Sequence, residues 1–201
     1  MKVNIFDCDG VVLDSKEAHW DFYCDFATAN GVALKRADFE RAIREPGEFF
    51  WQNVGIPTRL FKALNKTYTE DFGECEVKMF SGIPEMLERL SSSGVILTMA
   101  TFNRRVNVER AVGDSLRHFE RVFTYEDGRK EACVQKTFDV YGGSPSQYQL
   151  IGDTWWDIDT SERMGIGFVG VGWGWMKFPR QTPFPVLKTP KELGDYLIEN
   201  P

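Results

Sequence analysis

The sequence contains little that would support a disulfide framework or a zinc site. Its four cysteines, Cys8, Cys24, Cys75 and Cys133, are dispersed along the chain. None belongs to a C-x-x-C pair or to a cysteine–histidine pair at the spacing of metal ligands. We therefore expect free thiols in a reducing compartment.

Long apolar runs and an excess of basic charge are also missing. No stretch reaches the length of a membrane span, and the first residues lack the apolar run of a signal peptide. The 24 basic residues are outnumbered by 30 acidic ones, which gives a net charge of −6 and argues against general binding to nucleic acid or anionic membranes. We expect a cytoplasmic protein that is a monomer or a weak dimer.

What the chain does contain is a regular alternation of short apolar runs and helical patterns after about residue 79. The apolar runs are 3–6, 95–100, 121–125, 148–153 and 167–172, and helical patterns follow most of them. Apolar strands that alternate with helices predict a parallel sheet covered on both faces. The expected fold class is therefore α/β, a Rossmann-like, doubly wound parallel sheet. Residues 173–189, rich in proline, predict a long surface loop.

Residues 16 to 78 have a different sequence pattern, in which predicted helices follow one another without a predicted strand between them. The first pattern ends at Asn30-Gly31, a plausible C-cap, and Thr58 is placed as the N-cap of a later helix. The sequence thus predicts two units. Residues 1–15 and 79–201 form the α/β core, and residues 16–78 form a small all-helical domain inserted after the first strand.

Polar side chains follow several of the predicted strands directly. The segments are Asp7-Cys8-Asp9-Gly10, Thr101-Phe102-Asn103 and Gly152-Asp153-Thr154, and Lys130 begins the helix after another strand. Each residue alone has a simple structural explanation, such as a helix cap or a solvated lysine. Because ligands of open parallel sheets bind at the carboxyl ends of the strands, the joint placement predicts a functional site at this rim.

The residue types at this rim suit phosphoryl transfer through a covalent aspartyl intermediate. One carboxylate attacks phosphorus, and a second carboxylate protonates the leaving oxygen and later deprotonates the attacking water. Mg²⁺ prefers hard oxygen ligands and bridges carboxylate and phosphate. A hydroxyl and a lysine neutralise the charge that develops on the phosphoryl oxygens.

These motifs resemble those of the haloacid dehalogenase superfamily, of the phosphatase type, in the phosphoglycolate phosphatase-like or β-phosphoglucomutase-like subgroup. The motif D-x-D-G-x-x-x-D-S is met by Asp7, Asp9, Gly10, Asp14 and Ser15. The second motif is met by Thr101, and the fourth, G-D-x-x-x-D, by Gly152, Asp153 and Asp157. The resemblance spans essentially the whole chain, and the helical insertion is similar to a small C1-type cap.

The resemblance implies a role for each matching residue. Asp7 would be the nucleophile and Asp9 the general acid/base. Asp7, Asp153 and the carbonyl of Asp9 would hold Mg²⁺, with Asp157 supporting Asp153. Gly10 would let the backbone approach the phosphoryl group, which leaves no room for a Cβ there.

The resemblance also implies the groups that contact the substrate. Thr101 would donate its hydroxyl to phosphate, and Phe102 and Asn103 would lie in the same substrate-binding loop. The phosphate-neutralising lysine is expected to be Lys130, with Lys136 as the second choice because it lies inside a helix and closer to the last motif.

Three further features have open interpretations. His19 is either a substrate contact and gate on Asp9 or a helix residue packed beside its neighbours. The aromatic run 49–51 either lines a pocket or forms the core of the cap, which we favour. Trp155 and Trp156 either cover the mouth of the site or pack under the C-terminal loop, which we also favour.

The leading hypothesis is a Mg²⁺-dependent phosphatase that hydrolyses a small phosphorylated metabolite, an organic acid, a sugar phosphate or a nucleotide. One alternative is a β-phosphoglucomutase-like phosphomutase, although Gly152 stands where mutases often place Glu. Another is a catalytically silent regulatory member of the fold, which would be expected to lack at least one of the acids and hydroxyls named above.

Overall fold

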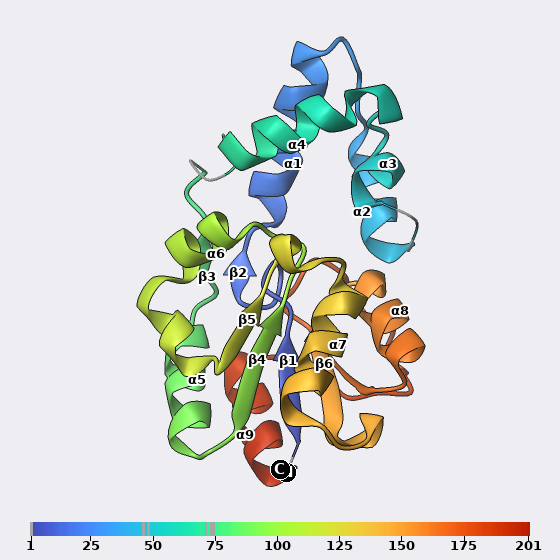
Figure 1. Ribbon diagram of the computed structural model, residues 1–201. Coiled ribbons are helices and arrows are strands. Elements are labelled where there is room, and N and C mark those ends of the chain that lie inside the picture. Colours follow the sequence, from blue (N-terminus) through green and yellow to red (C-terminus); the bar gives the residue numbers. More distant parts are fainter. Residues whose placement is uncertain (1, 46, 48, 71, 73–74) are drawn as a thin grey trace.

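The computed structural model describes residues 2–45, 47, 49–70, 72 and 75–201, and its centre is a six-stranded parallel sheet (Figure 1). The strands are β1 (Val3–Phe6), β4 (Ile96–Ala100), β5 (Arg121–Phe123), β6 (Tyr148–Gly152), β7 (Gly167–Val171) and β8 (Val186–Leu187). They pair in the order β5-β4-β1-β6-β7-β8, and every pairing is parallel. The doubly wound α/β fold predicted from the sequence is confirmed.

The sheet is apolar on both sides because helices cover both faces. Helices α5 (Ile83–Ser92), α6 (Arg105–Val112) and α9 (Pro190–Glu199) supply apolar side chains to one core, together with Phe6 of β1. Helices α7 (Lys130–Tyr141) and α8 (Trp155–Met164) supply the other core, together with Ile5. Alternate residues of β1 therefore point into different cores, and its carboxyl end is held rigidly between them.

The helical segment, residues 16–70, stands over the carboxyl end of the sheet (Figure 1). It comprises α1 (Lys16–Ala29), α2 (Arg36–Arg44), α3 (Phe50–Val54), the 3₁₀ helix η1 (Thr58–Leu60) and α4 (Phe61–Glu70). The chain enters it through β2 (Leu13–Asp14) and leaves it through β3 (Lys78–Met79), and these two strands pair antiparallel. That this segment acts as a separate cap domain stays a prediction.

Two expectations about local structure are wrong. Thr58 does not cap a helix with its side chain, because it begins a 3₁₀ turn whose N-cap position is Pro57. Residues 173–189 are not purely a surface loop, since they contain the edge strand β8, and Trp175 and Met176 are buried. A two-residue edge strand beside prolines gives almost no periodic signal in a sequence.

No helix in the described ranges is long and apolar enough to cross a membrane.

Candidate active site

Three neighbouring strands deliver the principal polar groups of the site. Strand β1 lies between β4 and β6, and each of the three is followed directly by a polar residue, Thr101 after β4, Asp7 after β1 and Asp153 after β6. All three side chains are buried. The strand order therefore brings residues from distant parts of the chain to one point, as expected for parallel strands that end at the same rim.

Lys130, the first residue of α7, lies between the carboxylates of Asp7 and Asp157. Its Nζ is 2.9 Å from Asp7 Oδ2 and 2.5 Å from Asp157 Oδ1. The lysine is buried, and burial opposes its charged form, but the Asp157 and Asp7 carboxylates outweigh burial and raise the pKa of Lys130. The lysine is therefore a permanent cation at the base of the site.

Asp7, Asp153 and Asp157 form a cluster of buried carboxylates. One oxygen from each lies within 4.8 Å of the others, a spacing that can hold a metal ion. Burial raises the pKa of Asp7 to about 7 although Lys130 opposes this, and burial, Asp157 and Asp7 raise the pKa of Asp153 as well. Three buried carboxylates share one neighbouring lysine, so the cluster can accommodate further positive charge.

The side chain of Asp153 supports the same interpretation. Its Oδ2 accepts a hydrogen bond from the backbone N–H of Trp175 at 2.6 Å. Its Oδ1 is buried without a hydrogen-bond partner among the described residues. A buried carboxylate oxygen that faces other carboxylates suits a hard divalent cation such as Mg²⁺. The residues present therefore fit the predicted metal.

Asp157 holds the loop that carries Asp153. Its Oδ2 accepts hydrogen bonds from the Asp153 N–H at 3.2 Å and from the N–H and hydroxyl of Thr154 at 3.1 and 2.8 Å. Thr154 and Asp157 together form a capping box at the start of α8. A Cβ on Gly152 would lie 2.3 Å from Asp157 Cβ, so this turn is possible only with glycine at that position.

Asp9 lies beside this cluster and faces a cavity that Asp7 also lines. Its Oδ2 accepts a hydrogen bond from Asn103 Nδ2 at 2.9 Å. Asn103 in turn places its backbone N–H 3.0 Å from Thr101 Oγ1. The turn after β4 thus positions both the predicted phosphate-binding hydroxyl and the predicted acid/base.

Gly10 allows the first loop to pass close to Asp153. Its φ of 79° lies in the left-handed region, and a Cβ there would stand 2.0 Å from Asp153 Oδ2. Even without the conformational strain, any side chain at this position would displace a predicted metal ligand. The structure therefore requires glycine here for the close approach to Asp153, and the approach of Gly10 to a phosphoryl group stays a prediction.

His19 is buried on α1 and lines the same cavity. Its Nδ1 lies 2.9 Å from the carbonyl oxygen of Ser15, and its Nε2 lies 3.1 Å from the hydroxyl of Tyr68. Its ring also packs against Phe72 and Trp175, with centroids 4.3 and 4.9 Å away. The histidine therefore packs against aromatic rings and also borders the cavity, whereas its role as a substrate contact or a gate on Asp9 stays a prediction.

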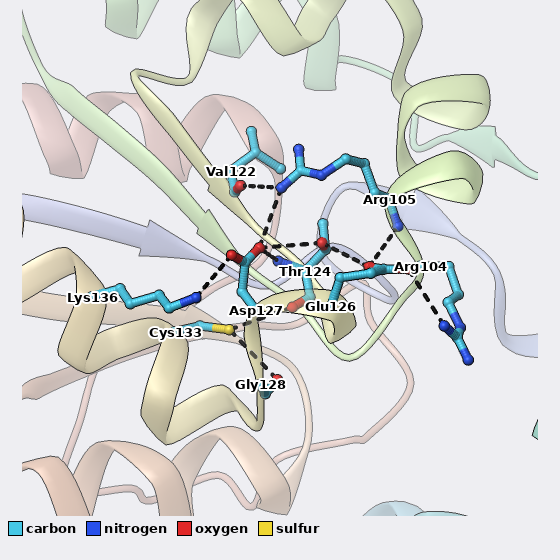
Figure 2. A network of polar contacts seen from close by, with 9 residues as sticks. All are labelled: Arg104, Arg105, Val122, Thr124, Glu126, Asp127, Gly128, Cys133 and Lys136. Carbon is cyan, nitrogen blue, oxygen red and sulfur yellow. Dashed lines mark hydrogen bonds and ion pairs between the residues drawn. The ribbon is translucent and has the colours of Figure 1, made fainter.

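Lys136, the alternative to Lys130, lies in a separate network of polar contacts (Figure 2). Its Nζ pairs with Asp127 Oδ1 at 2.9 Å, and Arg105 pairs with Asp127 Oδ2 at 3.2 Å. The same Oδ2 accepts the Thr124 N–H at 3.0 Å. This network fixes the turn between β5 and α7, and therefore the place where Lys130 begins its helix.

The cavity in front of the site has a volume of about 500 Å³. The core contributes Thr101, Phe102 and Lys130, and the helical segment contributes the aromatic residues Phe49 and Phe50 among others. The aromatic run 49–51 therefore lines a pocket in addition to packing within the helical segment.

The expectation for the tryptophan pair at the start of α8 is wrong. Trp156 Nε1 donates to the carbonyl of Ala42 on α2 at 2.8 Å, so this residue joins the core to the helical segment. Trp155 is 41% exposed, so the C-terminal loop does not bury it. The tryptophan that sequence reasoning missed is Trp175, which binds Asp153 from that loop. The glycine-rich run 170–174 before it was the available signal of a close backbone approach.

The comparisons with known proteins agree with this geometry. A family model described as haloacid dehalogenase-like hydrolase matches residues 4–171. The chain belongs to this family, as its motifs predicted.

Similar proteins extend over nearly the whole chain. A phosphoglycolate phosphatase from Aquifex aeolicus is 27% identical over 217 residues, which cover 96% of this chain and 95% of that protein. A 5′-nucleotidase from Pseudomonas aeruginosa is 31% identical over 187 residues, which cover 85% and 82%. The structure of a haloacid dehalogenase-like hydrolase from Streptococcus pneumoniae matches with a TM-score of 0.80 at 19% identity, covering 98% of both chains.

Proposed function

We propose that the protein is a Mg²⁺-dependent phosphatase that hydrolyses a small-molecule phosphomonoester through an aspartyl-phosphate on Asp7. The observation that carries the proposal is the buried cluster of Asp7, Asp153 and Asp157 around Lys130 at the ends of adjacent strands. Relatives named as phosphoglycolate phosphatase and 5′-nucleotidase support the same class of reaction.

In the first step, a carboxylate oxygen of Asp7 attacks phosphorus and the bond from phosphorus to the leaving oxygen breaks. Asp9, whose carboxyl group faces the same cavity, donates a proton to that oxygen. In the second step, Asp9 takes a proton from water, which attacks the phosphorus and releases Asp7. Asp7 and Asp9 thus have different roles in these steps. Of the two, Asp7 is the carboxylate that pairs with Lys130.

The remaining groups hold and neutralise the phosphoryl group. Asp7 and Asp153, with the carbonyl of Asp9, would hold Mg²⁺, which supplies positive charge to the phosphoryl oxygens when bound. Lys130 adds a fixed cation, and Thr101 offers a hydroxyl. Burial of the cluster excludes water from these interactions and so strengthens them.

The test is a phosphate-release assay over a library of phosphorylated metabolites with Mg²⁺. Asp7→Asn keeps the shape of the side chain but removes the nucleophile, and we expect at least a thousandfold loss of kcat for every substrate. Asp114→Asn, at an exposed position on the core, is the matched control and should keep wild-type activity. An active Asp7→Asn variant would refute the nucleophile assignment.

The same assay separates the two alternatives. A β-phosphoglucomutase-like phosphomutase would return the phosphoryl group to a sugar and release an isomer instead of phosphate. A catalytically silent member of the fold would release nothing from any substrate. Release of inorganic phosphate at a rate that depends on Asp7 excludes both.

A further inference from the structure

The wall of the active-site cavity is unusually rich in aromatic side chains. Ten of them line it, from both the core and the helical segment: Tyr23, Phe49, Phe50, Trp51, Phe61, Tyr68, Phe102, Tyr125, Trp156 and Trp175. Some of these rings stack on one another, as Trp51 does on Phe61 with centroids 5.3 Å apart. At about 500 Å³, the cavity is larger than a two- or three-carbon phosphorylated acid requires.

The charged groups of the wall are balanced and mostly paired with one another. Lys130 contacts Asp7, and Arg163 contacts Glu131 and Asp159 at 3.5 and 2.9 Å. The lining holds four acids, Asp7, Asp9, Glu131 and Asp159, and four cations, Arg104, Arg129, Lys130 and Arg163. Beyond the phosphoryl position, three arginines, Arg104, Arg129 and Arg163, stand against two acids, Glu131 and Asp159, which leaves a formal excess of one positive charge. Arg163 is held by both acids, and Arg129 lies over the ring of Phe49, 4.8 Å from its centroid.

The guanidinium of Arg104 is also occupied by neighbouring groups. Its guanidinium donates to Asn65 Oδ1 at 2.6 Å and lies 3.6 Å from Glu126 Oε1. It also lies over the ring of Tyr125, 4.4 Å from the centroid. This arginine braces the wall of the cavity and holds the ring of Tyr125 in place.

Two rings of the core are partly exposed, although Arg104 lies over one face of Tyr125. Phe102 is 42% exposed and Tyr125 is 39% exposed, although both line the cavity. The Nζ of Lys130 lies 5.5 Å from the centroid of Phe102 and 2.9 Å from Asp7 Oδ2. Phe102 therefore stands beside Lys130 and the position of the phosphoryl group, where the leaving group of a substrate begins.

We propose, building on the phosphatase function above, that the substrate carries a planar aromatic ring on its leaving group, as in a nucleoside 5′-monophosphate. The ring stacks on Phe102, which presents aromatic surface at little cost in conformational entropy. The paired Arg163, Glu131 and Asp159 offer donors and acceptors to the polar edge of a base. A small phosphorylated acid would use none of this surface.

The decisive comparison is between a nucleoside 5′-monophosphate and ribose 5-phosphate, which share the phosphoribosyl group and differ only in the base. We expect kcat/KM for AMP or UMP to exceed that for ribose 5-phosphate at least tenfold. Phe102→Ala should reduce this ratio to about threefold or less. Trp155→Ala, which removes an equally exposed ring outside the described lining of the cavity, should keep the wild-type ratio.

Ribose 5-phosphate or phosphoglycolate hydrolysed as efficiently as both nucleotides would overturn the inference while leaving the phosphatase function intact. If no ester releases phosphate, the phosphatase proposal fails instead, and the ring is then tested by equilibrium binding to the wild-type protein with Mg²⁺. Calorimetry should show AMP or UMP binding at least tenfold more tightly than ribose 5-phosphate. Equal affinities would overturn the inference in that case as well.

Discussion

The side-chain amide of Asn103 donates a hydrogen bond to Asp9 Oδ2 at 2.9 Å. The orientation of this amide is fixed from its other end, because Asn103 Oδ1 accepts from the Arg104 N–H at 2.8 Å, Asn107 Nδ2 at 3.0 Å and the Tyr68 hydroxyl at 3.3 Å. The proposed acid/base is thus held by a buried side chain that is itself held by both the core and the helical segment.

Asn103 is therefore expected to act as a positioning residue. Asn103→Ala should lower kcat about tenfold and change KM less than threefold, since it frees Asp9 without removing a phosphate ligand. Steady-state kinetics over a range of substrate concentrations measures kcat and KM separately. Asn200→Ala, at an exposed position after α9, is the control. An unchanged kcat, or a loss carried by KM alone, would contradict the role.

Lys130 and Lys136 can be separated by matched substitutions. Lys130→Met leaves two buried carboxylates without their cation, so we expect a loss of about 3–5 kcal/mol in unfolding free energy and a large loss of kcat. Lys136→Met removes a partly exposed pair with Asp127 and should cost about 1 kcal/mol or less, with activity kept. Urea unfolding and phosphate release measure both. The reverse pattern would favour Lys136 as the functional lysine.

Gly10 and Gly94 form a second matched pair, because both have a positive φ, 79° and 73°. A Cβ at Gly94 meets nothing within 4 Å, so Gly94→Ala should cost only about 1–2 kcal/mol of backbone strain and leave activity unchanged. Gly10→Ala bears the same strain and also drives a methyl group into Asp153 Oδ2. We expect it to lower kcat by about a hundredfold or more. Equal activity of the two variants would show that the close approach at Gly10 is not required.

Mg²⁺ should stabilise the folded protein through the carboxylate cluster. At about 100 times the Kd the gain is about 2.7 kcal/mol, which raises Tm by several degrees for a domain of this size. Asp153→Asn should abolish the rise, because it removes one of the buried carboxylates, whereas Asp139→Asn on α7 should keep it. Thermal unfolding with and without Mg²⁺ decides this independently of turnover. The same rise in Asp153→Asn would place the metal elsewhere.

The network around Asp127 should be visible in acid unfolding. Burial alone would raise the pKa of Asp127, but the Thr124 N–H, Lys136 and Arg105 outweigh it and lower that pKa from 3.8. Because the folded-state pKa is depressed, the stabilisation is present above about pH 4 and is lost as the pH falls below it. Asp127→Asn should therefore flatten the loss of stability between pH 4 and 2, as followed by urea unfolding. An acid limb identical to that of the wild type would contradict this.

The strand ends and their acids could be predicted from sequence because the relevant signals are local. Largely apolar runs marked β1, β4 and β6, and parallel strands share one rim, so Asp7 and Asp153 were expected at the same rim, where the observed strand order makes them neighbours. Lys130 followed from the order of the elements, since it begins the helix after β5.

Contacts between segments that lie far apart in the chain could not be predicted from the sequence. Trp175 reaches Asp153 only because residues 173–189 fold back over the sheet, and proline content indicated a loop without indicating its path. The contact of Tyr68 with Asn103 likewise depends on how α4 lies against the core. Neither contact changes the pattern of apolar and polar residues in the two segments that make it. Such contacts are therefore found only from the three-dimensional packing.

The pairing of β2 with β3 places Leu13 opposite Met79 and Asp14 opposite Lys78. The segment between these two strands is therefore inserted into the core at one place, where its entering and leaving ends pair with each other. Because residues of this insert line the cavity whereas Asp7, Thr101, Lys130 and Asp153 lie outside the insert, we expect its replacement to change which molecules enter and to leave these four groups in place.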